Sequence, residues 1–79
     1  MSPTVFHEKG YRFFFFSREE SRMHIHIYCN DGEAKFWLEP QVELANNSKL
    51  SRHQLKEIEH IIEAHNDELK QAWHKHFPG

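Results

Sequence analysis

Two histidines separated by one residue are the feature of this 79-residue sequence that most suggests chemistry. In the stretch HIHIYCNDGEAKFWL, His24 and His26 fall on one face of a predicted β-strand, because successive side chains point to opposite faces. Lys35 and Glu33 share that face on the next predicted strand. One imidazole can take the proton of a ribose 2′-hydroxyl, a second can protonate the leaving oxygen, and a cation can hold the phosphate. These four residues are therefore candidates for metal-independent RNA cleavage, although an exposed sheet face carries polar residues by default.

Further residues extend this candidate site. Arg12 lies on a neighbouring predicted strand with the same facing, and Arg22 just before the histidines favours an anionic ligand. Trp37 is predicted on the polar face beside His26, where it stacks a base, packs on a partner or indicates that the predicted register is wrong. His65 lies on the apolar stripe of the predicted helical segment. It is either a hydrogen-bonded core residue or a catalytic group where helix and sheet meet.

The histidine pair could also begin a metal site, but two imidazoles do not make a stable one. A third ligand would have to come from His65, Glu33 or Cys29, and the predicted register places Cys29 on the opposite face. We therefore predict no metal and no other cofactor.

The residues Asp31–Gly32 are a strong signal for a two-residue hairpin turn. With that turn, Asn30 pairs with Glu33, His26 with Trp37, and Ile25 with Leu38. The resulting apolar face consists of Ile25, Ile27, Cys29, Ala34, Phe36 and Leu38.

The other elements complete an α+β domain. Residues 4–6 and 11–17 are predicted strands, and Val42–Leu44 can add a short edge strand, so we expect an antiparallel sheet of three to four strands. Ser51 and Gln54 form a capping box at the start of a helical segment. Its apolar residues recur at three- and four-residue steps to about residue 77, and a break near Asn66–Asp67 is left open. We expect a single domain over 1–79, with the sheet half in 1–44 and the helical half in 51–77 packed across the apolar hairpin face.

Four consecutive phenylalanines in the second predicted strand raise a problem of burial. Phe13 and Phe15 share one face and Phe14 and Phe16 the other, so one pair faces away from the helix. That pair is covered either by loops and the N-terminal strand of the same chain or by a partner, because soluble monomers rarely leave such patches open. Phe14 and Phe16 are the candidate partner-binding residues.

Composition excludes several classes of protein. The net charge of −2, without a basic stripe, argues against non-specific nucleic-acid binding by bulk charge. No run of about 20 apolar residues predicts a membrane span, and the N-terminal stretch does not read as a signal peptide. We expect a cytoplasmic protein with no membrane partner.

The sequence resembles the small bacterial family called domain of unknown function 4160. The resemblance is carried by PTVFHEKGYRFFFFSREE, HIHI, GEAKFWLEP, VELANN and the tail LKEIEHIIEAHNDELKQAWHKHF, in that order. Members often have Pro-Pro before the His-x-His strand, where this chain has Arg22 and Met23. The resemblance implies a two-gene operon whose products act as toxin and antitoxin, with this family as the toxin.

Together these observations predict the toxin of a type II toxin–antitoxin pair. It would act on RNA or on translation and be neutralised by direct binding of a cognate antitoxin encoded next to it. The alternative is a non-catalytic interaction module whose aromatic surface docks a partner or a second copy in a homodimer.

Overall fold

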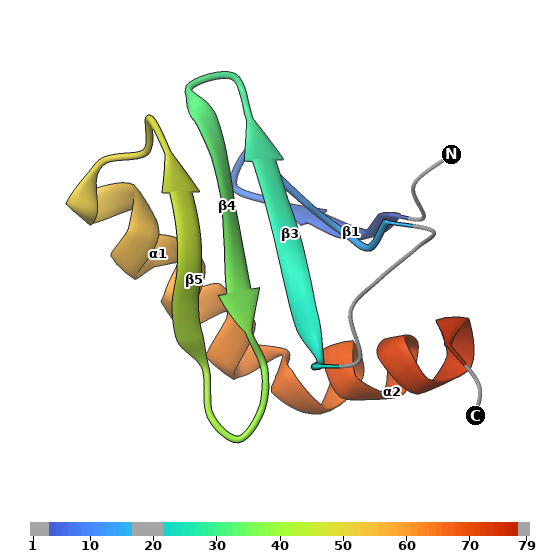
Figure 1. Cartoon of the computed structure of the whole chain (residues 1–79). Coiled ribbons are helices and arrows are strands. Elements are labelled where there is room, and N and C mark those ends of the chain that lie inside the picture. The colour runs from blue at the N-terminus through green and yellow to red at the C-terminus, as the bar shows by residue number, and fades with distance from the viewer. Residues whose placement is uncertain (1–3, 17–21, 78–79) are drawn as a thin grey trace.

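The computed structural model describes residues 4–16 and 22–77, which form an α+β domain. Five antiparallel strands lie side by side in chain order, with one helix against a face of the sheet and a second helix at its end (Figure 1). The predicted fold class is confirmed, but the predicted count of three to four strands is too low. The strands are β1 (Thr4–Glu8), β2 (Tyr11–Phe14), β3 (His24–Cys29), β4 (Gly32–Trp37) and β5 (Glu43–Ser48).

The connection between β1 and β2 is a two-residue hairpin turn. Lys9 and Gly10 both have positive φ, 53° and 84°, as the turn that matches the strand twist requires. Gly10 adopts this conformation without steric cost because it has no Cβ. The sequence suggests a turn over HEKG, residues 7–10, but only Lys9 and Gly10 form it, because His7 and Glu8 belong to β1.

The turn between β3 and β4 lies one residue earlier than predicted. Cys29 pairs with Gly32 and His26 with Lys35, so the turn residues are Asn30 and Asp31. Gly32 is a strand residue, and a Cβ there would collide with the carbonyl oxygen of Ser48. The glycine therefore permits the close approach of β5. Each cross-strand partner moves by two residues, which leaves every side chain on its predicted face.

The strand β5 is longer than the predicted segment Val42–Leu44. It pairs with β4 along Glu33–Trp37, with an irregularity between Lys35 and Phe36. Most of its side chains are exposed, so it lacks the alternation of apolar and polar residues that identifies a half-buried strand.

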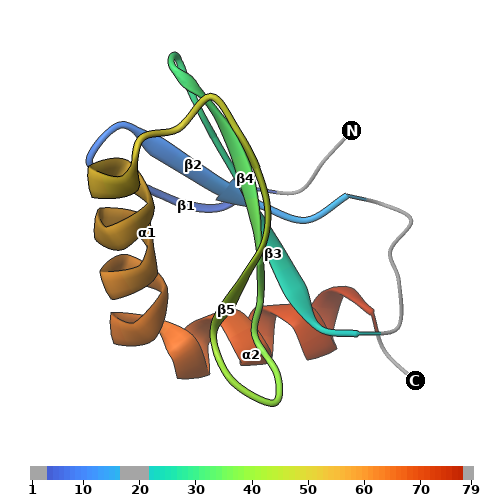
Figure 2. The ribbon, with the colours of Figure 1, turned by 60° about the vertical axis from the view of Figure 1, so that its left-hand side comes forward.

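Two helices replace the single helical segment expected from the sequence. The capping box before α1 (Arg52–Ala64) is confirmed. The backbone amide of Gln54 donates to Ser51 Oγ at 3.1 Å, and the backbone amide of Ser51 donates to Gln54 Oε1 at 2.9 Å. The chain bends at His65, one residue before the break that the sequence left open, and continues as α2 (Asn66–His76). In Figure 2, α1 lies along one face of the sheet and α2 runs past the end where β3 begins.

The core lies between the sheet and the helices. Its fully buried residues include Phe13, Ile25 and Ile27 of the strands and Leu38, which directly follows β4. The fully buried helix residues are Ile58, Ile62 and Leu69. The apolar hairpin face therefore meets the helical stripe as predicted. The opposite face of the sheet, hereafter the outer face, carries the polar residues of the hairpin.

Candidate functional site

The outer face has a row of side chains that crosses four strands. Phe14 of β2 pairs with His26 of β3, His26 with Lys35 of β4, and Lys35 with Asn46 of β5. Opposed residues on neighbouring strands have Cβ atoms about 5 Å apart, so their side chains meet. The row therefore brings together one histidine, one lysine, one amide and one aromatic ring.

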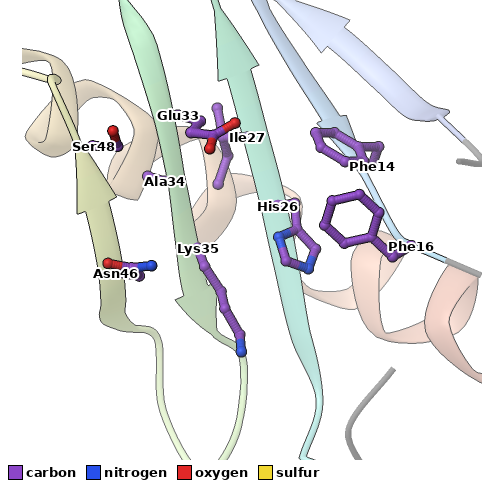
Figure 3. Close-up of a pocket in the computed structure, with 9 residues that line it drawn as sticks. All are labelled: Phe14, Phe16, His26, Ile27, Glu33, Ala34, Lys35, Asn46 and Ser48. Carbon is purple, nitrogen blue, oxygen red and sulfur yellow. The ribbon is translucent and has the colours of Figure 1, made fainter. Parts of the chain in front are cut away.

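A pocket of about 220 Å³ opens along this row (Figure 3). Phe14, Phe16 and His26 form an aromatic wall on one side. The His26 ring stacks on Phe14 with centroids 5.5 Å apart and meets the edge of Phe16 at 4.3 Å. Phe14 is only 6% exposed, whereas Phe16 is 45% exposed. The sequence correctly separated this pair from Phe13 and Phe15, which are buried in the core.

The other side of the pocket is polar. It is lined by Glu33 and Lys35 of β4 and by Asn46 and Ser48 of β5. The Asn46 side-chain oxygen accepts a hydrogen bond from the backbone amide of Asn47 at 2.9 Å. Its amide nitrogen consequently points toward β4 (Figure 3).

Three cations of the described chain contact aromatic rings on or beside the outer face. The Arg12 guanidinium carbon lies 4.4 Å from the Phe14 ring centroid. Arg22 and Lys35 lie 4.2 and 4.5 Å from the Trp37 ring centroid. We call these five residues the cation–aromatic strip.

Other contacts fix the ends of the strip. Arg12 Nε donates to Thr4 Oγ1 at 2.7 Å, and Arg22 Nε donates to the Glu39 carbonyl at 3.0 Å. Arg22 also lies 3.6 Å from Glu43, an exposed ion pair of modest strength. Both arginines are therefore held beside their aromatic partners.

His24 does not share the setting of His26. Its side chain is fully buried, which corrects the expectation of an open polar face. Nδ1 donates to the Arg22 carbonyl at 2.7 Å, and the ring packs against Trp37 and against Trp73 of α2. His24 pairs with Trp37, the position that the predicted register assigned to His26. The structure thus brings one imidazole, not two, to the pocket.

His65 lies at the junction of the two helices and does not line the pocket. Nε2 is 3.0 Å from Glu8 of β1, Nδ1 is 2.9 Å from Glu68 of α2, and the ring contacts Phe6. Hydrogen bonding to Glu68, and then to Glu8, raises the pKa of His65 above its usual value of about 6.5, although partial burial opposes this change. The residue links β1 to the helices, so a role in the pocket is not supported by its position.

This arrangement predicts a pH-dependent contribution of His65 to stability. Because the folded-state pKa is raised, the contribution is fully present below about pH 6.5 and is lost as the pH rises through the folded-state pKa. We expect His65→Gln to lower the free energy of unfolding by about 1 kcal/mol at pH 6, since partly exposed pairs are weak, and by less at pH 9. Urea unfolding at both pH values measures this difference. The control is His60→Gln, an exposed residue of α1, and an equal effect of both variants would contradict the assignment.

Two polar residues of the pocket were missed by sequence reasoning. Asn46 and Ser48 lie on β5, a strand that was predicted only as far as Leu44. Their two-residue spacing, the same as that of Glu33 and Lys35, was the available signal for a shared face.

Two further properties follow from the described residues. Among them, no group of three or more His, Cys, Asp or Glu side chains is placed to hold a metal ion. Neither described helix is both long enough and apolar enough to cross a membrane.

The fold and the site define a small α+β protein with a five-stranded antiparallel meander, two C-terminal helices and an aromatic-walled pocket on the outer face. Residues 10–74 match the family model described as Domain of unknown function (DUF4160), so the chain belongs to this family. No curated protein and no solved structure matches the chain.

Proposed function

We propose that this protein is the toxin of a type II toxin–antitoxin pair and acts in the cytoplasm on RNA, either free or in the translation machinery. The outer face binds single-stranded RNA, and a cognate antitoxin encoded next to the gene neutralises the toxin by covering that face. The observation that carries this proposal is the cation–aromatic strip beside a small pocket that contains His26.

Alternating cations and aromatic rings suit a single nucleic-acid strand. Bases stack on aromatic side chains while Lys and Arg pair with phosphates, largely independently of sequence. Trp37 holds Arg22 and Lys35 close together, and Arg12 lies at the other end of the strip. A strand crossing the outer face would meet cations on both sides of the pocket.

The size of the pocket limits what can enter it to a group of about the size of one base. Sites for drug-sized ligands usually measure about 300–1,000 Å³. At about 220 Å³, this pocket suits a single base inserted from a longer strand.

His26 and Lys35 supply the chemistry in this proposal. The His26 imidazole takes the proton of a 2′-hydroxyl, whose oxygen then forms a bond to the adjacent phosphorus. The bond from phosphorus to the 5′-oxygen breaks, and the leaving oxygen takes a proton from water. Lys35 stabilises the charge that develops on the phosphate oxygens. No metal ion takes part.

A non-catalytic interaction module is the second candidate. Phe16 and Tyr28 are 45% and 50% exposed on the outer face, and protein interfaces are enriched in such aromatic residues. A partner protein or a second copy would then cover the same pocket without any reaction.

Removal of Lys35 tests the RNA-binding part of the proposal. We expect Lys35→Ala to weaken binding of a fluorescent single-stranded RNA and to reduce the slope of log affinity against log salt by about 0.7, because one phosphate contact is lost. Fluorescence anisotropy over a salt series measures both quantities. The control is Lys56→Ala, an exposed lysine of α1, which leaves the slope unchanged. Equal slopes for the wild type and both variants would contradict an RNA path across Lys35.

A further inference from the structure

We infer that the pocket is a guanine-binding site, which receives one guanine base of single-stranded RNA between its aromatic and polar walls. This inference rests on the proposed action on RNA and adds a base preference to it. It depends on the order of hydrogen-bond donors and acceptors along β4 and β5.

The polar wall consists of two successive rows. In one row, Lys35 of β4 pairs with Asn46 of β5, and in the next, Glu33 pairs with Ser48. The Lys35 ammonium lies over the Trp37 ring, beside the pocket, so the donors of this row are those of the Asn46 side-chain nitrogen, whose neighbouring oxygen accepts from the Asn47 backbone amide. An ionised Glu33 carboxylate can only accept, and the Ser48 hydroxyl can do either. The pocket thus has donors in one row and an acceptor in the neighbouring row.

Guanine matches this order better than the other three bases. Its O6 and N7 atoms accept hydrogen bonds, and the adjacent N1–H and N2–H groups donate. O6 or N7 would face the side-chain amide nitrogen of Asn46, while N1–H and N2–H would both donate to the Glu33 carboxylate. Adenine, cytosine and uracil each lack a ring N–H group next to an exocyclic amino group. Each of them therefore offers fewer hydrogen bonds to the Glu33 carboxylate.

The aromatic wall supplies the stacking surface for the base. Phe16 and His26 meet edge to face at 4.3 Å, and the Phe14 ring contacts both of them. Phe16 is the exposed member of this wall and is reached first by an entering base. Stacking holds any base in the pocket, and the polar rows select among bases.

Four short RNAs test the inference with the full chain. Fluorescence anisotropy would compare heptamers of uridine whose central residue is G, A, C or U. We expect the guanine heptamer to bind about tenfold more tightly than the others, the discrimination expected from a good bidentate contact. Equal affinity for all four would overturn the guanine inference and leave RNA binding standing. Failure of all four to bind would overturn the inference and the proposed function together.

A carboxamide variant identifies the residue responsible. Glu33→Gln is expected to reduce the ratio of guanine to adenine affinity by about tenfold. The ratio is the required readout, because removing a negative charge also raises the affinity for every RNA. Glu63→Gln makes the same charge change on the exposed surface of α1 and should keep the wild-type ratio. An unchanged ratio in Glu33→Gln would overturn the assignment. The assignment would also be overturned if Glu33→Gln bound RNA like the wild type but no longer bound the co-expressed antitoxin, because the pocket would then be a protein-binding site.

Discussion

Cells that express His26→Ala are expected to keep growing, whereas cells that express the wild type stop growing. His26 is the one described histidine that lines the pocket, and it pairs across the strands with Lys35. Loss of a general acid or base typically slows a reaction by about 10²- to 10⁴-fold. A decrease of that size in RNA cleavage would abolish toxicity. Growth after induction, together with the integrity of total RNA, measures the effect.

Comparison with a second histidine variant separates chemistry from folding. His60 is exposed on α1, so His60→Ala should remain toxic and equally soluble. Arrest by both the wild type and His26→Ala would mean that toxicity comes from binding and would direct attention to Phe16. Arrest by neither protein would contradict the toxin proposal and favour the interaction module.

The sequence predicted the faces of the β3–β4 hairpin better than its pairing. Which side chains are buried depends on their alternation between the two faces of a strand. A shift of two residues in the cross-strand partner leaves each side chain on the same face. Gly32 misled the placement of the turn because glycine suits both turns and close backbone approaches. Only the position of β5, whose Ser48 carbonyl lies against Gly32, shows which of these applies. That contact depends on tertiary structure and has no local signature.

The candidate site was predictable in part for the same reason. His26, Lys35 and Glu33 were assigned to one face from local spacing, and the structure places them around one pocket. His24 has the same spacing but is buried, because α2 runs past the start of β3 and brings Trp73 against it. At the bend, His65 contacts Glu8 of β1, a residue 57 positions earlier in the chain, and a periodic pattern in the sequence does not reveal such a contact.

Substitutions in the phenylalanine run are expected to have two different effects: loss of stability at Phe13 and loss of RNA binding at Phe16. Phe13 is fully buried and stacks on Phe6 at 4.6 Å, so Phe13→Ala leaves a cavity in the core. Such substitutions cost about 3–5 kcal/mol. At about 0.05–0.15 kcal/mol per residue, a chain of this length has a total stability of about 4–12 kcal/mol. Urea unfolding should therefore show that Phe13→Ala loses a large part of the stability of the domain, with a transition midpoint well below that of the wild type.

Phe16→Ala is expected to show the opposite pattern. Its ring is 45% exposed and contacts the outer-face rings of Phe14 and His26, so we expect a loss of about 1 kcal/mol or less. Binding of single-stranded RNA should fall by about fivefold or more, since stacking on one aromatic ring is worth about 1–3 kcal/mol per base. Unfolding curves and anisotropy on the same samples measure both effects. A Phe16→Ala protein that unfolds as readily as Phe13→Ala would show that the outer pair is structural, and the pocket would then have no aromatic side chain reserved for a ligand.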